Sequence, residues 1–311
     1  MSDSPKCRLV TRSDFDGLVC AVLLKEHGLI DRIDFVHPKD MQDGKIPMGP
    51  DDISTNLPYV PGCRLAFDHH ASEMTRVSGH PDNHIIDPKA ASAARVVYNY
   101  FGGAEAFPKV SAEMMAAVDK ADSAQFSLDE ILHPKGWVLL SFLMDARTGL
   151  GRFRDFRVSN YQLMMQLIDY CRDHTIDQIL QLPDVRERAD LYAAHHDQAR
   201  AQLRRLAEVY GKLVFLDLRN ENVIYATNRF TLYALYPQVN ISIHAIWGVK
   251  KQNTAFAIGK SIIDRSCKLD VGALCLKYGG GGHEAAGTCQ VANEDAERVL
   301  GELMTEITAA G

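Results

Sequence analysis

The first part of the chain, about 125 residues long, alternates between short apolar runs and longer segments with helical spacing. Apolar runs of strand length are found at Cys7–Thr11, Ile33–His37, Ile53–Tyr59, Arg64–Phe67 and Ile85–Ile86. The spacing of apolar residues between these runs predicts helices over Leu18–His27, Ala90–Tyr100 and Ala112–Val118. Strands that alternate with helices predict an α/β domain with a mostly parallel, doubly wound sheet and helices on both faces.

The rest of the chain has a different pattern. Residues 160–205 are predominantly helical in spacing and include a long helix over Leu191–Leu206, which indicates a linking segment. Strand-like runs follow at Leu213–Leu216, Val223–Ala226, Val239–Ile243 and Ala255–Ile258, and a last helix is expected over Asn293–Ile307. We therefore expect an α/β domain at 1–158, a helical linker at 159–210 and a smaller α/β domain with a mixed sheet at 211–311.

Acidic and imidazole side chains follow two of the predicted strands. Asp14 and Asp16 come after the first strand, and Asp68-His69-His70 closes the fourth. Open α/β sheets keep their active sites at the carboxyl ends of strands, and carboxylates and imidazoles bind divalent cations. Side chains two apart on an extended strand share a face, so both aspartates are expected to reach one metal site. The alternative is an Asx turn in which Asp16 caps the following helix.

The two histidines at the end of the fourth strand suggest two roles. One would bind metal, and its neighbour, facing the other way, would hold or protonate a phosphate oxygen; the alternative is a surface turn. A further acidic cluster, Asp119-Lys120-Ala121-Asp122, follows the helical pattern at Ala112–Val118. An acid there could reach the same site, although from spacing alone a solvated helix end in which Lys120 pairs with Asp119 is the better explanation.

A run of four glycines, Gly279–Gly282, precedes His283. Consecutive glycines expose backbone N–H groups, and ahead of a helix-like start this arrangement predicts a binding site for phosphate or carboxylate oxygens. A flexible linker is the alternative, but it fits poorly between the apolar residues on either side.

Composition narrows the function. A chain of 311 residues is long enough for two domains, and a net charge of −6 argues against a protein that coats long nucleic acids. A short phosphorylated substrate needs only a local positive cluster and stays compatible. Seven cysteines without CxxC spacing argue against a disulfide framework or thiolate zinc site. Since no apolar run approaches the roughly 18 residues of a membrane span, and Met1 to Ser4 lack a signal peptide's apolar stretch, we expect a cytoplasmic protein without a membrane partner.

Four motifs together resemble those of a known family. Asp14-x-Asp16-Gly17, Asp68-His69-His70, Asp122-Ser123 and Gly279–His283 occur in the order found in the DHH phosphoesterase superfamily. The resemblance covers nearly the whole chain and is greatest to two-domain, exopolyphosphatase-like or oligoribonuclease-like members. It implies a DHH catalytic, metal-binding domain at 1–158 and a DHH-associated substrate-binding domain at 211–311.

The resemblance also implies a reaction: manganese-dependent hydrolysis of short oligonucleotides or small nucleotides in an interdomain cleft. One or two Mn²⁺ or Mg²⁺ ions would be bound by Asp16, His69 and Asp122, with Asp14 helping to hold the second ion. His70 would contact the scissile phosphate and Asp68 would support this catalytic cluster. The nonscissile end of the substrate would be held by Arg265, Ser266, Gly280, Gly281, Gly282 and His283. Relatives are often homodimers, and the resemblance extends that expectation to this chain.

Two positions depart from the family pattern. Many relatives have a histidine two or four residues before the first motif aspartate, where this chain has Arg12 and Val10. The aspartate that bridges two ions has no clean match: Asp52 and Asn56 are the candidates, Asn56 is the nearer in position, and an amide cannot bridge cations as a carboxylate does. His37, at the end of the second strand, could replace a ligand, and Arg12 could place a positive charge where the second ion would sit. These departures favour one alternative function, a degenerate, non-catalytic nucleotide- or phosphate-binding protein. Among enzymes, the alternative is hydrolysis of inorganic polyphosphate.

Overall fold

The computed structural model describes residues 6–79 and 81–309, so Met1 to Ser4 lie outside the described residues. The chain forms two compact units. Unit 1 comprises Met1–Phe126, Pro134–Ala146 and Leu150–Asp190, and unit 2 comprises Ser127–His133, Arg147–Gly149 and Leu191–Gly311. The three-part division at residues 158 and 210 stays a prediction.

Unit 1 is built on a five-stranded parallel sheet in the order β2-β1-β3-β4-β5. Its strands are β1 (Cys7–Arg12), β2 (Ile30–Val36), β3 (Asp52–Thr55), β4 (Leu65–Asp68) and β5 (His84–Ile86). The predicted α/β fold with a parallel sheet is confirmed. The chain passes from β1 to β2 on one side of β1 and then crosses back to β3 on its other side, so the carboxyl ends of β1 and β3 flank a topological switch point, where such sheets bind ligands. The predicted third strand was too long, because Asn56 follows β3 with a left-handed φ of 55°.

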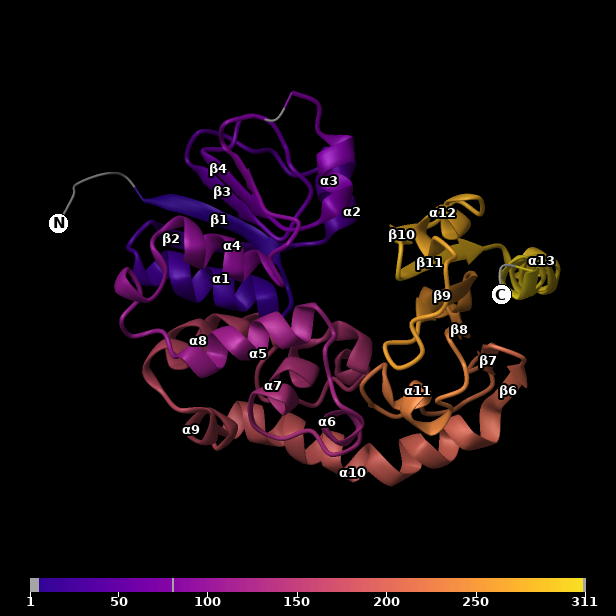
Figure 1. The fold of residues 1–311 in the computed structure, drawn as a ribbon. Coiled ribbons are helices and arrows are strands. Elements are labelled where there is room, and N and C mark those ends of the chain that lie inside the picture. The colour runs from indigo at the N-terminus through magenta and orange to yellow at the C-terminus, as the bar shows by residue number, and fades with distance from the viewer. Residues whose placement is uncertain (1–5, 80, 310–311) are drawn as a thin grey trace. The chain divides into compact units, whose positions relative to one another are not determined.

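Helices cover this sheet on both faces, as predicted. The α-helices that lie wholly in unit 1 are α1 (Phe15–Glu26), α2 (Pro38–Gln42), α3 (Ala71–Arg76), α4 (Ala93–Tyr100), α5 (Ala112–Asp122), α7 (Gly136–Met144), α8 (Asn160–Asp173) and α9 (Ile176–Leu180). Helix α1 is buried from Phe15 to Leu24 and contacts β1 as well as α4, α5 and α8 (Figure 1). On the sheet's other face Val10 of β1 packs with Met41 of α2. The nearly all-apolar sequence of α1 is therefore a consequence of burial on every side.

Helix α10 (Pro183–Leu206) continues from unit 1 into unit 2 without a break. Its buried Arg188 is 1% exposed and donates hydrogen bonds to the carbonyls of Asp184 and Val158, and its guanidinium lies over the Phe156 ring. A guanidinium can be buried at low cost only when its N–H groups find acceptors in this way.

Unit 2 contains a six-stranded mixed sheet in the order β10-β11-β9-β8-β7-β6, in which only β7 and β8 are parallel. The strands are β6 (Ala207–Tyr210), β7 (Leu213–Asp217), β8 (Ile241–Trp247), β9 (Thr254–Lys260), β10 (Gly281–His283) and β11 (Ala286–Val291). Its helices, besides the second part of α10, are α6 (Leu128–Leu132), α11 (Thr231–Leu235), α12 (Val271–Leu276) and α13 (Ala296–Ala309). The smaller domain with a mixed sheet is thus confirmed.

The strand predicted over Val223–Ala226 is wrong. The backbone of this segment bonds to side chains of α10 instead of to a neighbouring strand: Gln202 donates to the Val223 carbonyl and accepts from the Tyr225 N–H, and His195 Nδ1 accepts from the Ala226 N–H. These side chains satisfy the backbone groups that a sheet would otherwise satisfy.

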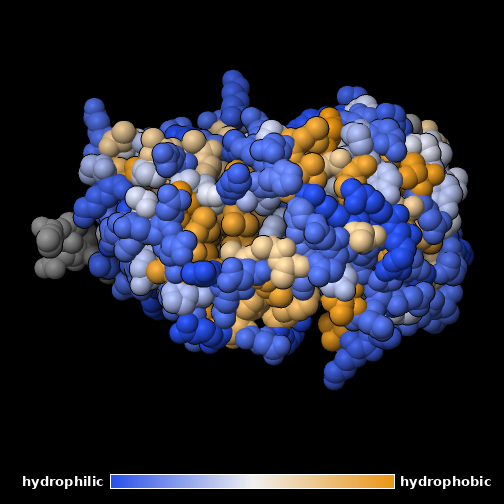
Figure 2. Space-filling model, turned by 90° about the horizontal axis from the view of Figure 1, so that it is seen from below, coloured by the Kyte–Doolittle hydropathy of each residue, from blue (hydrophilic) through white to orange (hydrophobic). Residues whose placement is uncertain are grey.

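The face of the molecule drawn in Figure 2 is mainly hydrophilic. On the face drawn in Figure 2, hydrophobic residues reach the surface in patches set among hydrophilic ones. Within residues 6–79 and 81–309, no helix combines the length and apolar character that a membrane span requires.

Candidate metal centre

Three side chains from distant parts of the sequence converge in unit 1. Asp16 lies in the first turn of α1, His69 directly follows β4, and Asp122 is the last residue of α5. One ligand atom from each lies within 4.8 Å of the others. Two ligands of one octahedral ion, each about 2.1 Å from it, lie about 3 Å apart, and the 2.8 Å between His69 Nε2 and Asp122 Oδ2 matches that separation.

Asp16 is held in place by the start of another helix. Its Oδ2 accepts from the N–H of Ala93 at 3.0 Å and its Oδ1 from the N–H of Ala94 at 2.8 Å, at the N-terminus of α4. A helix N-terminus offers unpaired N–H groups and a favourable dipole to a carboxylate. The residue that caps α1 is Asp14, whose Oδ1 accepts from the Gly17 N–H at 2.9 Å. The alternative with Asp16 as the cap is therefore wrong, and so is the expectation that both aspartates share one face of an extended strand.

His69 is oriented through its other ring nitrogen. Nδ1 lies 3.3 Å from the Ala90 carbonyl, which can only accept, so Nδ1 carries a proton. Nε2 is buried and has no hydrogen-bond partner among residues 6–79 and 81–309, because its close approach to Asp122 lacks the angles of a hydrogen bond. A buried ring nitrogen that is aimed at carboxylates and makes no hydrogen bond is an arrangement suited to a metal ligand.

The electrostatics of the three residues indicate a missing positive charge. Burial, together with the charges of Asp122 and Asp14, raises the pKa of Asp16 to about 8. Burial would lower the pKa of His69, but Asp122 and then Asp16 raise it to about 9. Burial would raise the pKa of Asp122, and contact with His69 lowers it instead. Protons thus take the role that a cation would fill, and a set of two carboxylates and one imidazole fits a divalent ion.

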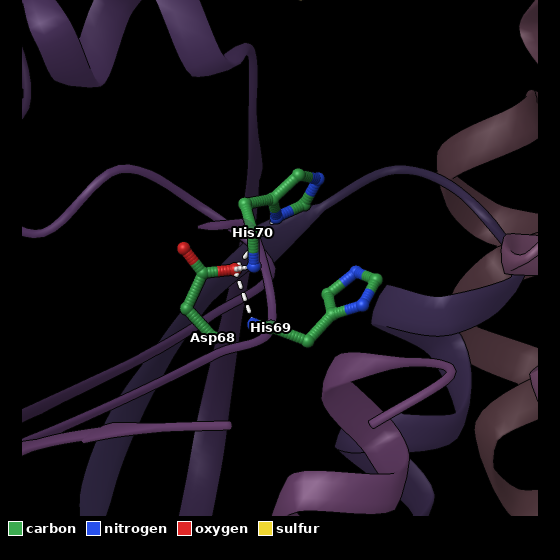
Figure 3. A group of neighbouring side chains, drawn as sticks. All are labelled: Asp68, His69 and His70. Atoms are coloured by element: carbon green, nitrogen blue, oxygen red, sulfur yellow. Dashed lines mark hydrogen bonds and ion pairs between the residues drawn. The ribbon is translucent and has the colours of Figure 1, made fainter. Parts of the chain in front are cut away.

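Asp68 organises the two histidines that follow it. Its Oδ1 accepts from the backbone N–H groups of His69 at 2.8 Å and His70 at 3.2 Å, and lies 2.7 Å from His70 Nδ1 (Figure 3). The imidazole rings lie side by side, with centroids 4.5 Å apart, so the expectation that they face opposite ways is wrong. Burial would lower the pKa of His70, but the hydrogen bond to Asp68 and its charge raise it. The His70 side chain is 37% exposed and so presents its imidazole to solvent beside the centre.

Arg12, Asp14 and Asn56 meet at the switch point between β1 and β3. Arg12 Nε lies 3.0 Å from Asp14 Oδ2, and Asn56 Nδ2 lies 3.2 Å and 3.4 Å from the two Asp14 oxygens. Both positions that depart from the family pattern therefore contact the same aspartate.

Two other candidate ligands have structural partners. Asp52 is at the amino end of β3, where it accepts from Arg8 Nε at 2.8 Å and from the Gly49 N–H at 2.7 Å. His37 caps α2, with Nδ1 accepting from the Lys39 N–H at 3.2 Å. Neither belongs to a group of converging metal-ligand atoms in the described part of the chain.

The glycine segment belongs to unit 2 and is a β-hairpin, so the expected helix-like start after it is wrong. A Cβ at Gly280 would lie 2.2 Å from the Thr288 carbonyl oxygen, and one at Gly282 would lie 2.3 Å from that of Ala286, so packing explains these glycines. A Cβ at Gly281 would meet nothing within 4 Å. Gly279 also has open space around it, but its φ of 72° favours glycine, so Gly281 is the glycine of this run that neither close packing nor backbone conformation explains.

The other predicted substrate-binding residues also lie in unit 2. His283 Nδ1 accepts from the Ala285 N–H, Arg265 Nε donates to the Ile262 carbonyl, and the Ser266 hydroxyl accepts from Asn240 Nδ2. Arg265, Ser266 and His283 are exposed.

Sequence reasoning missed the residues that support the centre. Asp119 does not merely face solvent at a helix end: it accepts from the Ser92 hydroxyl at 2.8 Å and from Arg95 at 2.6 Å and 2.9 Å. These bonds tie the N-terminus of α4, which holds Asp16, to α5, which carries Asp122. The one available signal was Ser92 ahead of an alanine-rich helical run, which is typical of a helix N-cap.

Comparison with known proteins extends the resemblance to solved structures. No protein-family model matches the chain, and no curated protein sequence matches it. The chain is 61% identical to a pGpG-specific phosphodiesterase, PggH, from Vibrio cholerae; the match covers 98% of this chain and 100% of that one, with a TM-score of 0.84. It also shares its fold with an exopolyphosphatase-related protein from Bacteroides fragilis (14% identity, 98% and 93% covered, TM-score 0.54). RecJ from Thermus thermophilus in complex with Mn²⁺ is similar in fold as well (13% identity, 97% and 52% covered, TM-score 0.56).

Proposed function

The chain belongs to the DHH phosphoesterase superfamily, and on that premise we propose that it is a divalent-metal-dependent phosphodiesterase that hydrolyses short linear oligonucleotides such as pGpG. The observation that carries this proposal is the convergence of Asp16, His69 and Asp122 on one point beside the half-buried His70. The substrate follows from the relative that is 61% identical over nearly the whole chain.

The residues of the centre have separate tasks in the proposed reaction. A divalent cation held by Asp16, His69 and Asp122 would supply an activated water and neutralise charge that develops on the phosphoryl group. The N-terminus of α4 keeps the Asp16 oxygens in place, and the Ala90 carbonyl keeps the His69 ring turned toward the carboxylates. This preorganisation means that the ligands need not rearrange during the reaction.

His70 is the proposed proton donor. Because Asp68 holds Nδ1, Nε2 is the ring nitrogen left for a substrate oxygen. Asp68 raises the pKa of His70, which favours the protonated imidazole, the form that can donate a hydrogen bond from Nε2 to a phosphate oxygen. Asp68 acts through His70 and is a positioning residue.

We propose Mn²⁺ as the ion. Carboxylate oxygens suit Mg²⁺ and Mn²⁺, whereas an imidazole ligand favours the softer transition metals, so a mixed set of two carboxylates and a histidine favours Mn²⁺ over Mg²⁺.

The glycine hairpin of unit 2 is the proposed holder of an anionic group on the substrate. Gly281, whose missing side chain packing does not require, would let a phosphate approach the backbone, and the exposed Arg265, Ser266 and His283 would add polar contacts. Homodimer formation and a cytoplasmic location also remain predictions, which light scattering and cell fractionation test.

A substrate panel tests the function. The chain is stripped of metal, supplied with Mn²⁺ and assayed on pGpG, pApA, longer oligonucleotides, a cyclic dinucleotide and inorganic polyphosphate. We expect hydrolysis of the linear dinucleotides and a loss of at least about 1000-fold in Asp122→Asn, with unchanged circular dichroism. Asp129→Asn, an exposed acid on α6, is the matched control and keeps full activity. Hydrolysis of polyphosphate alone would favour the exopolyphosphatase alternative, and tight pGpG binding without turnover would favour the non-catalytic one.

A further inference from the structure

We propose that Arg12 takes the place of a second divalent cation beside Asp14, so that the centre of unit 1 holds one metal ion and one fixed guanidinium charge. The proposal concerns the three residues at the switch point, Arg12, Asp14 and Asn56, and how they differ from the cluster of Asp16, His69 and Asp122.

The carboxylate of Asp14 is already surrounded by donors. Oδ1 accepts from the Gly17 N–H at 2.9 Å and from Asn56 Nδ2 at 3.2 Å, while Oδ2 faces Arg12 Nε at 3.0 Å. A cation that used Asp14 as a ligand would have to displace a guanidinium that carries the same sign of charge. The donors around Asp14 thus stabilise the charge of its carboxylate, as a second ion would.

Asn56 presents a donor where a bridging ligand would need an acceptor. The residue is 2% exposed and has a left-handed φ of 55°, and its N–H bonds to the Phe67 carbonyl at 3.1 Å, so its backbone is fixed. Its Nδ2 points at Asp14, and its Oδ1 is buried without a hydrogen-bond partner among the described residues. A buried acceptor without a hydrogen bond costs stability, so Oδ1 does not explain why the amide is held in this orientation. The hydrogen bond from Nδ2 to Asp14 is the contact that stabilises it.

The charges of the two groups differ. Asp14 is paired with the Arg12 guanidinium, whereas Asp16 and Asp122 converge on the imidazole of His69. The excess of negative charge that a cation would balance therefore lies at Asp16, His69 and Asp122.

Arg12 is placed to act on a substrate as well. Its side chain is 34% exposed, so part of the guanidinium faces solvent beside the centre. A guanidinium fork suits the oxygens of a phosphate group. This second role, binding the phosphate that is cleaved, rests on the proposed function, whereas the metal count does not.

Titration with manganese alone tests the metal count. The metal-free full-length chain is titrated with MnCl₂ by calorimetry, and the bound ion is followed by electron paramagnetic resonance. We expect one Mn²⁺ per chain and the six-line spectrum of an isolated ion. The double substitution Arg12→His and Asn56→Asp places metal-binding side chains on both sides of Asp14, and aspartate tolerates a left-handed φ. This variant is expected to bind a second Mn²⁺ and to show a spectrum broadened by spin coupling.

Controls separate the two roles of Arg12. Arg32→His, on an exposed arginine of β2, adds a histidine away from the centre and should still bind one ion. Arg12→Ala is expected to keep one Mn²⁺ and to lose about 100-fold in kcat on pGpG, with unchanged circular dichroism; should the double variant not fold, this single variant and the wild-type titration decide. A wild-type chain that binds two Mn²⁺ ions, or a folded double variant that binds one, overturns the proposed metal count, and an Arg12→Ala enzyme with wild-type kcat overturns the second role of Arg12. Absence of hydrolysis by the wild type refutes the proposed function and leaves the metal count readable.

Discussion

In the metal-free protein, unit 1 is expected to lose stability as the pH rises from 6.5 to 9. The folded cluster holds protons that the unfolded chain releases: the pKa of Asp16 is about 8 against 3.8, and that of His69 about 9 against 6.5. Where the folded state binds more protons than the unfolded state, the free energy of unfolding falls as the pH increases. The stabilisation by His69 is complete below pH 6.5 and is lost as the pH rises through 9. For Asp16, the cost of ionising the buried carboxyl lowers the free energy of unfolding progressively until the pH reaches about 8.

The size of the effect follows from the proton that Asp16 retains. From pH 6.5 to 8 is 1.5 pH units, and at 1.36 kcal/mol per unit one retained proton gives a loss of about 2 kcal/mol. From pH 6.5 to 9 is 2.5 pH units, so His69 taken alone would add a loss of about 3 kcal/mol in the same direction; because the two titrations are coupled, we expect a total between about 2 and 5 kcal/mol. Mn²⁺ needs the deprotonated ligands, so it should stabilise the protein most at pH 8 to 9 and remove the decline.

Urea unfolding of the chelator-treated protein measures this effect. The chain has two tryptophans, and Trp247→Phe leaves Trp137 of unit 1 as the fluorescent reporter. In the same background, Asp122→Asn should flatten the pH dependence, because the Asp122 charge raises both pKa values. Asp190→Asn, at an acid that is 72% exposed, should leave it unchanged. A stability of metal-free unit 1 that is flat or rising between pH 6.5 and 9 would refute the reasoning.

Three further substitutions probe separate parts of the molecule. His69→Ala should weaken Mn²⁺ binding by at least about 100-fold and abolish the rise in Tm that Mn²⁺ produces, as measured by scanning fluorimetry; a Tm that still rises would show that the ion binds elsewhere. Gly281→Ala should keep Tm within about 2 °C, because the added Cβ meets no neighbouring atom, and should raise KM for pGpG. Gly280→Ala should lower Tm by several degrees, because the added Cβ would clash with the backbone of β11. Equal losses of Tm in the two variants would contradict this account. Arg188→Met should destabilise unit 1 by about 2 to 4 kcal/mol in urea unfolding, against less than about 0.5 kcal/mol for the exposed Arg186→Met, and similar small effects of both would show that the buried hydrogen bonds contribute little.

The sequence was sufficient to predict the elements that come from a repeating pattern and the side chains that directly follow a strand. Short apolar runs that alternate with helical spacing predicted the parallel sheet, and the acids and imidazoles after β1 and β4 were expected at its carboxyl edge. That Asp16 and His69 lie beside Asp122 followed from the family resemblance, since nothing in the spacing of α5 shows which of its faces meets α1.

What the sequence could not show are contacts that depend on tertiary structure. Asp119 has an adjacent lysine in sequence, yet its partners are Ser92 and Arg95 of a neighbouring helix. Asp14 rather than Asp16 caps α1 because of its extended backbone, which a pair of aspartates two apart does not reveal. Glycines have no side chains that could alternate between apolar and polar, so the sequence pattern did not predict the hairpin of β10 and β11.

The path of the chain between its two units limits how this protein can be taken apart. Helix α6 lies between unit 1 segments in sequence but belongs to unit 2, where the Ile131 carbonyl accepts from the buried Asn228 side chain and the Leu132 carbonyl from Arg200. A fragment that starts at Leu191 would leave Asn228 and Arg200 without these acceptors and would begin in the middle of α10. Truncation therefore cannot yield an intact unit 2. Recombination with a related gene at a single crossover point would separate α6 from the rest of unit 2 and so break these hydrogen bonds. Biophysical dissection of this chain calls for circular permutation or a grafted α6 peptide.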